Sequence, residues 1–551
     1  MAPLNVAART HLAAALIALA GVAPAIGAAH ATAFPRVDPF ALAMAQATAG
    51  DGDAAAFYAA RGHAPLWLGA GAGDHRAALI DAFARAADHG LPASRFDPDA
   101  LRAAFATADD PASLAALEAR TTAALLAYAR AVATGILDPA RIDPAIVLER
   151  PDRDWTRMLE DFARDPWETL AALRPQGPGY RSLLKEKRRL EDMAARGGWG
   201  DPVPGDRVLR PGDRGADVAA LRRRLVAMGR ARPSALAVFD ADLAAALRRF
   251  QEDHGLASDG EAGPATLRAL NVALEDRLAQ IVLNLERRRW LNRPREDRHV
   301  LVNIAEQRAY VIDDGVATFD TVVVVGAPSD DRRTPEFSDT MTHMVVNPTW
   351  YVPRSIAVNE YLPALKRGGA RHLEVFSNRG RVNPRAVDFG QYTARTFPFS
   401  LRQPPGPKNA LGKVKFMFPN RHNIYLHDTP SKHLFSEDVR TYSHGCIRVG
   451  RPFELAHHLL APQEADPEAA FARILHAGAE RKVDLADPIG VHLVYWSAWV
   501  TPDGRVNYRG DPYGRDAAVL AALRAAGVET GLAPGLRLVT DGGLDGDTDQ
   551  S

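Results

Sequence analysis

The hydrophobic pattern of the chain changes its period near residue 299, and this change constrains the fold most. Before it, apolar residues recur at helical spacing, as in "DHRAALIDAFARAADHG", where Leu79, Phe83 and Ala87 lie four positions apart. From His299, "HVLVNIAEQRAYVIDDGVATFDTVVVVG" shows the alternation of β-branched residues that strands favour, and "DDG" suits a hairpin turn. At 551 residues the chain is also too long for one core. We therefore predict a multidomain α+β protein, helical first and β-rich in its C-terminal third.

Turn-rich stretches divide the chain into segments. "DPVPGDRVLRPGDRG", which begins at Asp201, is rich in proline, glycine and charge and favours a linker, and three short amphipathic helices follow it. The final "DGGLDGDTDQS" is polar and acidic, which favours disorder. The predicted division is a signal segment 1–33, a helical scaffold domain 34–205, a three-helix module 206–272, a connecting helix 273–297, a β-rich domain 298–500, a C-terminal extension 501–540 that packs on the scaffold, and a disordered tail 541–551.

The first residues have the layout of a secretory signal peptide. An arginine-bearing start precedes an apolar run from Leu12 to about Ile26, and small residues follow at Ala29, Ala31 and Ala33. An uncleaved membrane anchor is the alternative, although the run is broken by proline and is shorter than the ~20 residues that a span needs. No later segment is long and apolar enough to cross a membrane. We expect an exported, periplasmic protein that is at most peripheral to the membrane or anchored by its N-terminus.

Charge and cysteine content narrow the function classes. Lysine plus arginine equals aspartate plus glutamate at 67 each, so no global field attracts nucleic acid. The single cysteine, Cys446, excludes an intrachain disulfide and any zinc site with several cysteines. An oxidising compartment exposes a lone thiol to oxidation, and a small buried hydrophobe is the default interpretation of such a residue. The neighbours of Cys446 must therefore decide its role.

Two short motifs place reactive side chains near each other. If "NIYLH" is a strand, Tyr425 and His427 point to the same face, because side chains alternate. In "SHGC", Gly445 lies directly before Cys446 and leaves room for backbone N–H groups that could bind a developing oxyanion. A neighbouring imidazole can hold a thiol as thiolate. This pattern favours a cysteine nucleophile with His427 as its base.

Two other interpretations of these residues stay open. Zinc needs three or four convergent ligands, and the spacing of the histidines and the cysteine matches no common zinc pattern. A purely structural His444–Cys446 pair is the second, although it explains poorly the intervening Gly445. The possible zinc ligands are His422, His427, His433, His444 and Cys446.

The same motifs resemble those of the L,D-transpeptidase family, in which a strand histidine is followed by Ser/Thr-His-Gly-Cys, an aliphatic residue and usually arginine. These positions are held here by His427 and by Ser443 to Arg448, and the likeness continues over about residues 298–500. "PGDRG", "DVAALRRRLVAMG" and "FQEDHGLASDG" resemble the peptidoglycan-binding three-helix module over about residues 208–272. "FYAARGHAPLWL" and "VHLVYWSAWVTPDGRVNYRGDPYGRD" resemble flanking segments of the large Gram-negative subtype, which carries a helical scaffold domain.

The resemblance implies roles for individual residues. Cys446 would be the nucleophile and His427 the base, oriented by the backbone carbonyl of Asp428, where many members of the family have glycine instead. Amides of His444, Gly445 and Cys446 would form the oxyanion hole. Arg448 could position a substrate carboxylate or brace its loop, and the "NPTWYVPRS" stretch could line the cleft or form a packed aromatic pair. The candidate substrate-binding residues are Tyr425, Arg448, Ser443 and Trp350, with Tyr351 and Arg354 as further candidates for the cleft.

The implied reaction transfers an acyl group between peptidoglycan stem peptides and forms 3→3 cross-links. It requires no metal and no organic cofactor, and the implied partners are stem peptides and glycan. A carboxypeptidase or exchange enzyme with the same site, and a non-catalytic wall-binding scaffold, remain alternatives. The stretch 359–413 is rich enough in glycine and proline to be a mobile lid, or else an ordinary insertion. The sequence indicates no oligomeric state.

Overall fold

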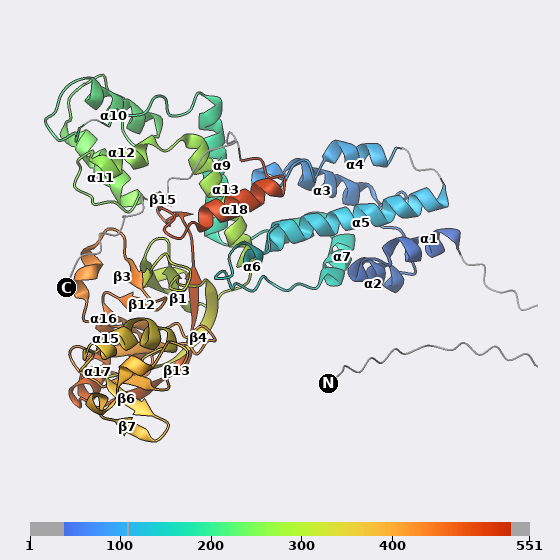
Figure 1. The fold of residues 1–551 in the computed structure, drawn as a ribbon. Helices are drawn as coiled ribbons and strands as arrows, with labels where there is room; N and C mark the ends of the chain where they lie inside the picture. The colour runs from blue at the N-terminus through green and yellow to red at the C-terminus, as the bar shows by residue number, and fades with distance from the viewer. Residues whose placement is uncertain (1–37, 107–109, 206, 531–551) are drawn as a thin grey trace, which may run out of the picture.

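The computed structural model describes residues 38–106, 110–205 and 207–530. The predicted signal segment lies outside the described residues, and so does the predicted tail at 541–551. The predicted multidomain α+β class is confirmed, because helices dominate up to Trp290 and strands predominate from Arg298. Figure 1 shows the first helices on one side, the three-helix module at one end and the β-rich domain at the other.

The N-terminal region is a helical domain built around one long helix, α5, which spans Pro111–Thr134. Asp110 caps α5 in a capping box with Ser113, and aspartates likewise cap several of the shorter helices. The buried carboxylate of Glu118 on α5 accepts the amide of Trp67, which ties a loop to this helix. The other elements are α1 Pro39–Thr48, α2 Gly52–Ala60, α3 Gly73–Ala84, η1 Ala87–His89, α4 Pro98–Ala104, α6 Pro139–Ile142, α7 Trp155–Arg164, α8 Pro166–Leu173 and α9 Pro178–Ala195.

The module consists of three short helices around a small apolar core. α10 spans Ala216–Ala227, α11 spans Ala241–Asp253 and α12 spans Pro264–Asn271. Leu221, Leu247 and Leu270, one from each helix, are fully buried together. Helical spacing in the sequence therefore identified the face that forms this core.

The helix expected to connect the module to the β-rich domain is a central element of the structure. α13, Leu274–Trp290, is buried on all its faces and contacts α5, α9, α18 and β14. Two of its arginines are buried in ion pairs, Arg289 with Glu286 and Arg287 with Asp516 of the C-terminal region. The apolar positions of "DRLAQIVLNLERRRWL" predicted the helix, but they could not show that its arginines are buried as well.

The β-rich domain contains a sheet that closes on itself. Its order is β11-β3-β12-β10-β9-β4-β13-β1-β2, and β2 also pairs with β3, which completes the barrel. Its interior is filled by apolar side chains such as Val302, Met344 and Leu426. The strands are β1 Arg298–Asn303, β2 Arg308–Asp313, β3 Val316–Gly326, β4 Phe337–Val346, β9 Val414–Met417, β10 Leu426–His427, β11 Thr441–Ser443, β12 Ile447–Val449 and β13 Arg481–Val494, and helices α16 Pro452–Leu460 and α17 Pro467–His476 pack beside them.

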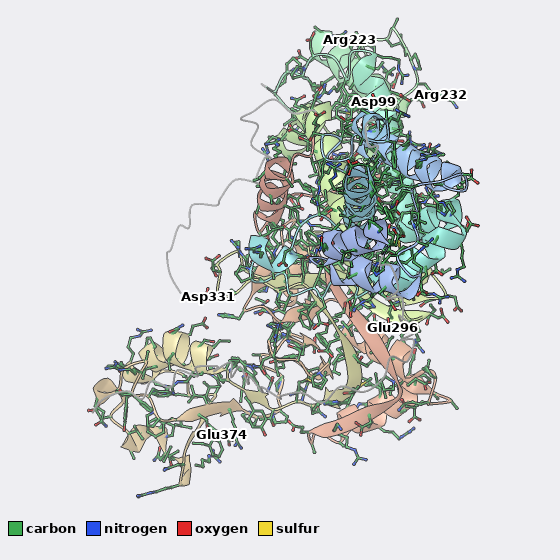
Figure 2. The ribbon with its side chains drawn as sticks, turned by 90° about the vertical axis from the view of Figure 1, so that its right-hand side faces the viewer. Asp99, Arg223, Arg232, Glu296, Asp331 and Glu374 are labelled. Atoms are coloured by element: carbon green, nitrogen blue, oxygen red, sulfur yellow. The ribbon has the colours of Figure 1, made fainter. Side chains whose placement is uncertain are left out.

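The stretch between β4 and β9 folds into a small subdomain rather than an irregular segment. A four-stranded sheet of order β5-β8-β6-β7 lies beside short helices, and Leu362, Val375 and Leu401 are buried in a core of its own. Figure 1 shows β6 and β7 at the far end of the molecule, and Figure 2 labels Glu374 of β6. This insertion subdomain comprises β5 Trp350–Tyr351, α14 Arg354–Ile356, the π-helix η2 Ala357–Tyr361, α15 Leu362–Lys366, β6 Glu374–Ser377, β7 Gly380–Val382, η3 Pro384–Ala386, η4 Phe389–Gln391 and β8 Ser400–Gln403.

The C-terminal region packs on several parts of the chain. The hairpin of β14 Ala498–Val500 and β15 Val506–Tyr508 contacts α9, α11 and α13, and α18, Arg515–Ala525, contacts α6 and α13. Fully buried Arg515 binds Asp143 after α6 and Glu336 before β4. The region therefore joins the helical domain to the barrel. None of the helices in the described ranges has the length and apolar character needed to cross a membrane.

Candidate active site

A cavity of about 410 Å³ opens between the barrel and the insertion subdomain. β10 and β12, the loop before β12, and the π-helix η2 all contribute to its wall. It contains both residues of the predicted catalytic pair and most of the predicted substrate-binding residues. The residues that matter below are Trp350, Glu360, Tyr361, Tyr425, His427, Ser443, His444, Cys446 and Arg448.

His427 is held in one orientation by the backbone. It is the last residue of β10 and is almost fully buried, and its Nδ1–H donates a 2.5 Å hydrogen bond to the carbonyl of Asp428. This bond leaves Nε2 as the nitrogen that can accept a proton. Burial, reinforced by the positive charge of Arg448, lowers the pKa of His427 to about 3. The imidazole is therefore neutral at neutral pH, with its unprotonated nitrogen at Nε2.

Gly445 gives the loop before Cys446 a conformation that other residues rarely adopt. Its φ is +100°, and an added Cβ would lie 3.2 Å from Cδ1 of Ile424. Its carbonyl accepts a 2.8 Å hydrogen bond from buried Thr334. This hydrogen bond from Thr334 fixes the turn, which leaves Cys446 partly exposed at the cavity.

Cys446 is a neutral thiol rather than a stored thiolate. Its Sγ lies 3.5 Å from the carbonyl of Asn423, to which the S–H donates. Burial raises the pKa of this thiol to about 11, against the opposing effects of Tyr425, Arg448 and Lys415. A preformed thiolate–imidazolium pair, which the motif predicted, is therefore disfavoured.

Tyr425 stands beside both reactive groups. Its ring meets that of His427 edge to face at 5.7 Å between centroids, as the alternation of the strand predicted. Its hydroxyl hydrogen-bonds to Cys446 and accepts from the indole of Trp350, and burial raises the pKa of the phenol well above its usual range. Trp350 and Tyr425 line the same cavity as Cys446.

The donors available to an oxyanion differ in part from the expectation. The Gly445 N–H donates to Oγ of Ser443 at 3.2 Å, and the same hydroxyl donates to the carbonyl of Cys446. Gly445 is thus occupied rather than free to bind an oxyanion. The amides of His444 and Cys446 donate no hydrogen bond among the described residues. They remain the backbone donors beside the sulfur.

Arg448 is a cation without a protein partner in the cavity. It lies on β12 directly opposite His427 in the parallel pairing, so the two side chains share one face. No carboxylate or carbonyl in the described chain binds its guanidinium. Lys415 on β9 pairs with His427 from the other side, which places positive charge on both flanks of the histidine. The row of Lys415, His427 and Arg448 can attract an anionic substrate group.

His444 is bound through its side chain by the insertion subdomain. Its Nε2 contacts Oε1 of Glu360 on η2, and Arg332 binds the same oxygen at 3.2 Å. The sequence suggested a backbone amide, a zinc ligand or a structural pairing with Cys446 as the role of His444, and it did not indicate Glu360. The two residues are 84 positions apart, and the spacing of the motifs holds no signal for such a contact.

Asp428 uses its side chain as well as its carbonyl. Oδ2 accepts the amide of Lys413 at 2.8 Å, and Oδ1 accepts the amide of Thr429 at 2.7 Å and the ammonium of Lys432. The side chain of Asp428, at a position where glycine is common, therefore stabilises the backbone at Lys413 and at Thr429. The carbonyl still serves His427, so the departure leaves the base in place.

Several candidates lie away from the cavity. Tyr351 is exposed and stacks against Arg402, and Arg354 donates to the carbonyl of Ala394, so neither lines the cleft. His422 borders the cavity but packs on Phe337, and His433 is exposed on η5, Lys432–Ser436. Across the described ranges, no three His, Cys, Asp or Glu side chains are close enough together to hold a metal ion.

Supporting residues behind the site also escaped the sequence analysis. Asn420 binds both the amide and the carbonyl of Ile424, which shapes the turn that presents the Asn423 carbonyl to the thiol. Tyr513, from the C-terminal region, donates to Gly326 at 2.7 Å and accepts the amide of Thr334. Only the "PN" before "RHNIYLH" offered a turn signal that could have indicated Asn420.

Comparison with known protein families identifies these domains. Residues 297–512 match the L,D-transpeptidase catalytic domain, residues 214–270 a peptidoglycan binding domain and residues 52–186 a scaffold domain. The β-rich domain is thus similar to the catalytic domain of the L,D-transpeptidase family. The cavity with Cys446 and His427 lies inside the matched L,D-transpeptidase domain.

One curated relative and two solved structures are similar to parts of this chain. A Haemophilus influenzae protein assigned by name to the L,D-transpeptidases is 31% identical over 243 residues, which are 43% of this chain and 48% of that protein. The chain thus spans about half the length of this curated relative. L,D-transpeptidase structures from Stackebrandtia nassauensis and Xylanimonas cellulosilytica are 14% and 15% identical and each cover 53% of this chain. They are covered to 96% and 100%, with TM-scores of 0.20 and 0.17, too low to support an inference.

Proposed function

We propose that this protein is a peptidoglycan L,D-transpeptidase that forms 3→3 cross-links through a thioester on Cys446. One observation carries the proposal: Cys446 and His427 line the same cavity, and the Asp428 carbonyl holds His427 with Nε2 free to take a proton. The peptidoglycan-binding module supports the substrate class.

The first step releases D-alanine. His427 Nε2 takes the proton of Cys446 as the sulfur attacks the carbonyl of the third residue of a tetrapeptide stem, which is meso-diaminopimelate in most Gram-negative walls. The oxyanion is bound by the amides of His444 and Cys446. His427 then returns the proton to the leaving amine, and a thioester remains. Arg448, without a protein partner, binds a carboxylate of the donor stem.

The second step forms the cross-link. The side-chain amine of a second stem attacks the thioester, its proton passes to His427, and the thiol of Cys446 is restored. The neutral thiol and imidazole of the resting site suit this cycle, because the same histidine must accept and return a proton in each half. The module raises the local concentration of the enzyme on its polymer. We place this activity in the periplasm.

The test measures muropeptides by mass spectrometry after incubation with purified protein. We expect cross-linked dimers and D-alanine from the wild type and neither product from Cys446→Ala. Abundant tripeptide without dimers would identify the L,D-carboxypeptidase or exchange alternative instead. Unchanged wall turnover by Cys446→Ala would show that Cys446 is not the nucleophile, and no turnover by either protein would leave the non-catalytic scaffold.

A further inference from the structure

A second large cavity, of about 700 Å³, lies where the helical domain meets the barrel, remote from Cys446. Its wall includes the turn between α8 and α9, the end of α13 with the following loop, and the first strands of the barrel. Figure 2 labels Glu296, which marks this junction on the face toward the viewer. We refer to it as the arginine cavity.

The arginine cavity has an unbalanced charge. Five arginines line it, and no aspartate or glutamate does. In a chain whose total charges are equal, this is a local excess of positive charge. The arginines are Arg153, Arg174, Arg288, Arg293 and Arg295, with buried His299 beside them.

These guanidinium groups lack the partners that arginines have elsewhere in the molecule. Arg153 donates only to the carbonyl of Asn292, and the Nε atoms of Arg153 and Arg288 are buried without an acceptor. Within the described ranges, none of the five forms an ion pair. The carboxylate of Glu296, the residue after Arg295, contacts His492. Guanidinium N–H groups without an acceptor can bind an oxyanion, whose oxygens accept two parallel hydrogen bonds from one guanidinium.

Arg288 is held in place before any ligand binds. Its guanidinium carbon lies 3.4 Å from the centre of the Trp496 ring, and a Cβ on Gly179 would lie 3.0 Å from its Nη1. The group is thus held flat between an indole and the backbone at the start of α9. Such preorganisation lowers the entropic cost of binding.

The charges also repel one another. Burial and the proximity of Arg295 lower the pKa of Arg288 to about 9, and burial, together with Arg293, lowers that of Arg295 against the opposing effect of Glu296. A multivalent anion would relieve both effects at once. A single carboxylate would neutralise only one guanidinium and would leave most of the 700 Å³ empty.

We propose that the arginine cavity is a binding site for a phosphate-bearing oligoanion of the pyrophosphate class. A free soluble phosphate and the head group of a phospholipid offer the same chemistry to the five arginines. The site is separate from the transpeptidase cavity, so it does not depend on the function proposed for Cys446.

The test titrates the full-length protein with inorganic pyrophosphate by calorimetry at constant ionic strength. The double variant Arg174→Gln/Arg293→Gln removes two exposed cations of the cavity, which the fold does not need. Arg223→Gln, an exposed arginine of α10 labelled in Figure 2, is the matched control. We expect saturable binding by the wild type and the control, and a loss of affinity of at least about tenfold in the double variant.

Two further arms identify the ligand. Sedimentation with phosphatidylglycerol vesicles, compared between wild type and double variant, distinguishes a head group from a soluble phosphate. Citrate provides a carboxylate of similar charge, and tighter binding of citrate than of pyrophosphate would overturn the phosphate assignment. Absence of saturable pyrophosphate binding, or equal affinity in the double variant, would overturn the site itself.

Discussion

Glu360 of the π-helix η2 contacts Nε2 of His444, two residues before the candidate nucleophile. The insertion subdomain therefore contacts the loop that presents Cys446 through one carboxylate, which Arg332 also binds. π-turns inside helices are rare and occur often at functional sites. This contact makes Glu360 a positioning residue for the loop.

The variant Glu360→Gln tests this contact. It keeps the size of the side chain and removes its charge, so we expect Cys446 to be acylated by a carbapenem about tenfold more slowly, as a loop loses a charged contact. Intact-mass spectrometry over time measures this rate. The control is Glu374→Gln, which removes a carboxylate of the same subdomain that pairs with Arg381 instead. Equal rates in both variants would show that Glu360 does not position the loop.

The variants Gly445→Ala and Gly380→Ala together distinguish the effect of backbone strain from the effect of a close contact with Ile424. At φ +100° an alanine is strained by about 1–2 kcal/mol, and here it would also press on Ile424. The displaced sulfur should slow acylation by about 100-fold or more. Gly380→Ala is the matched control, since its φ is +112° but nothing lies within 4 Å of the added Cβ. The expectation fails if Gly445→Ala retains the rate of the control.

Tyr425→Phe tests the influence of the phenol on the thiol. Burial raises the pKa of Cys446 to about 11, and the hydrogen bond from Tyr425 lowers it, so removal of the hydroxyl should raise it further. Less thiolate would then be present at any given pH, and alkylation by iodoacetamide should slow by up to about tenfold per unit of pKa. The pH dependence of alkylation measures this. Tyr442→Phe, an exposed tyrosine of β11, should behave as wild type.

Asp428→Gly restores the residue that many family members have at this position. The glycine keeps the carbonyl that orients His427 and loses three side-chain hydrogen bonds, so we expect a loss of about 2–3 kcal/mol of stability with acylation nearly unchanged. Thermal melting and acylation rates report the two effects. Lys432→Ala, which removes only the ammonium partner, should cost less. A large fall in acylation rate by Asp428→Gly would assign the carboxylate a direct role in the chemistry.

Acid should destabilise the protein through its buried histidines. Burial lowers the pKa of His89 and of His427 to about 3 and that of His492 to about 4. The unfolded chain binds protons there from about pH 6.5 downward, so this stability is complete above that value and falls toward about pH 3, at ~1.4 kcal/mol per pH unit and histidine.

The variant His89→Gln isolates one of these histidines. Its melting temperature should depend less steeply on pH between about 6.5 and 4 than that of the wild type. Burial also raises the pKa of Glu118 and Glu336, an effect of opposite sign that both proteins share. Exposed His433→Gln should follow the wild-type curve. Identical slopes for His89→Gln and the wild type would contradict the burial effect.

Local sequence rules were sufficient for the centre of the site. Strand alternation placed Tyr425 and His427 on one face, and the glycine before Cys446 indicated the turn that the structure contains. Both rules act over a few residues, so one sequence carries them fully. The period change at residue 299 predicted the fold class for the same reason.

Contacts between distant segments could not be predicted in this way. Glu360, Thr334 and Tyr513 act on the Cys446 loop from 86, 112 and 67 positions away (446 − 360, 446 − 334, 513 − 446). The protonation state of the thiol depends on burial, which the motif does not encode. The insertion subdomain shows the same limit, because its glycines and prolines left a mobile lid and an ordinary insertion open and did not indicate that its apolar residues form a separate core.

The burial of α13 bears on how a wall-binding module can work in this molecule. Leu278, Ile281 and Leu285 of this helix share one apolar core with the module and with the hairpin of β14 and β15. Arg505 of the hairpin also binds Asp253 at the end of α11. The module is therefore packed against the rest of the protein and is not attached only through a flexible linker. A glycan strand bound to the module would therefore reach Cys446 at a fixed distance and in a fixed orientation.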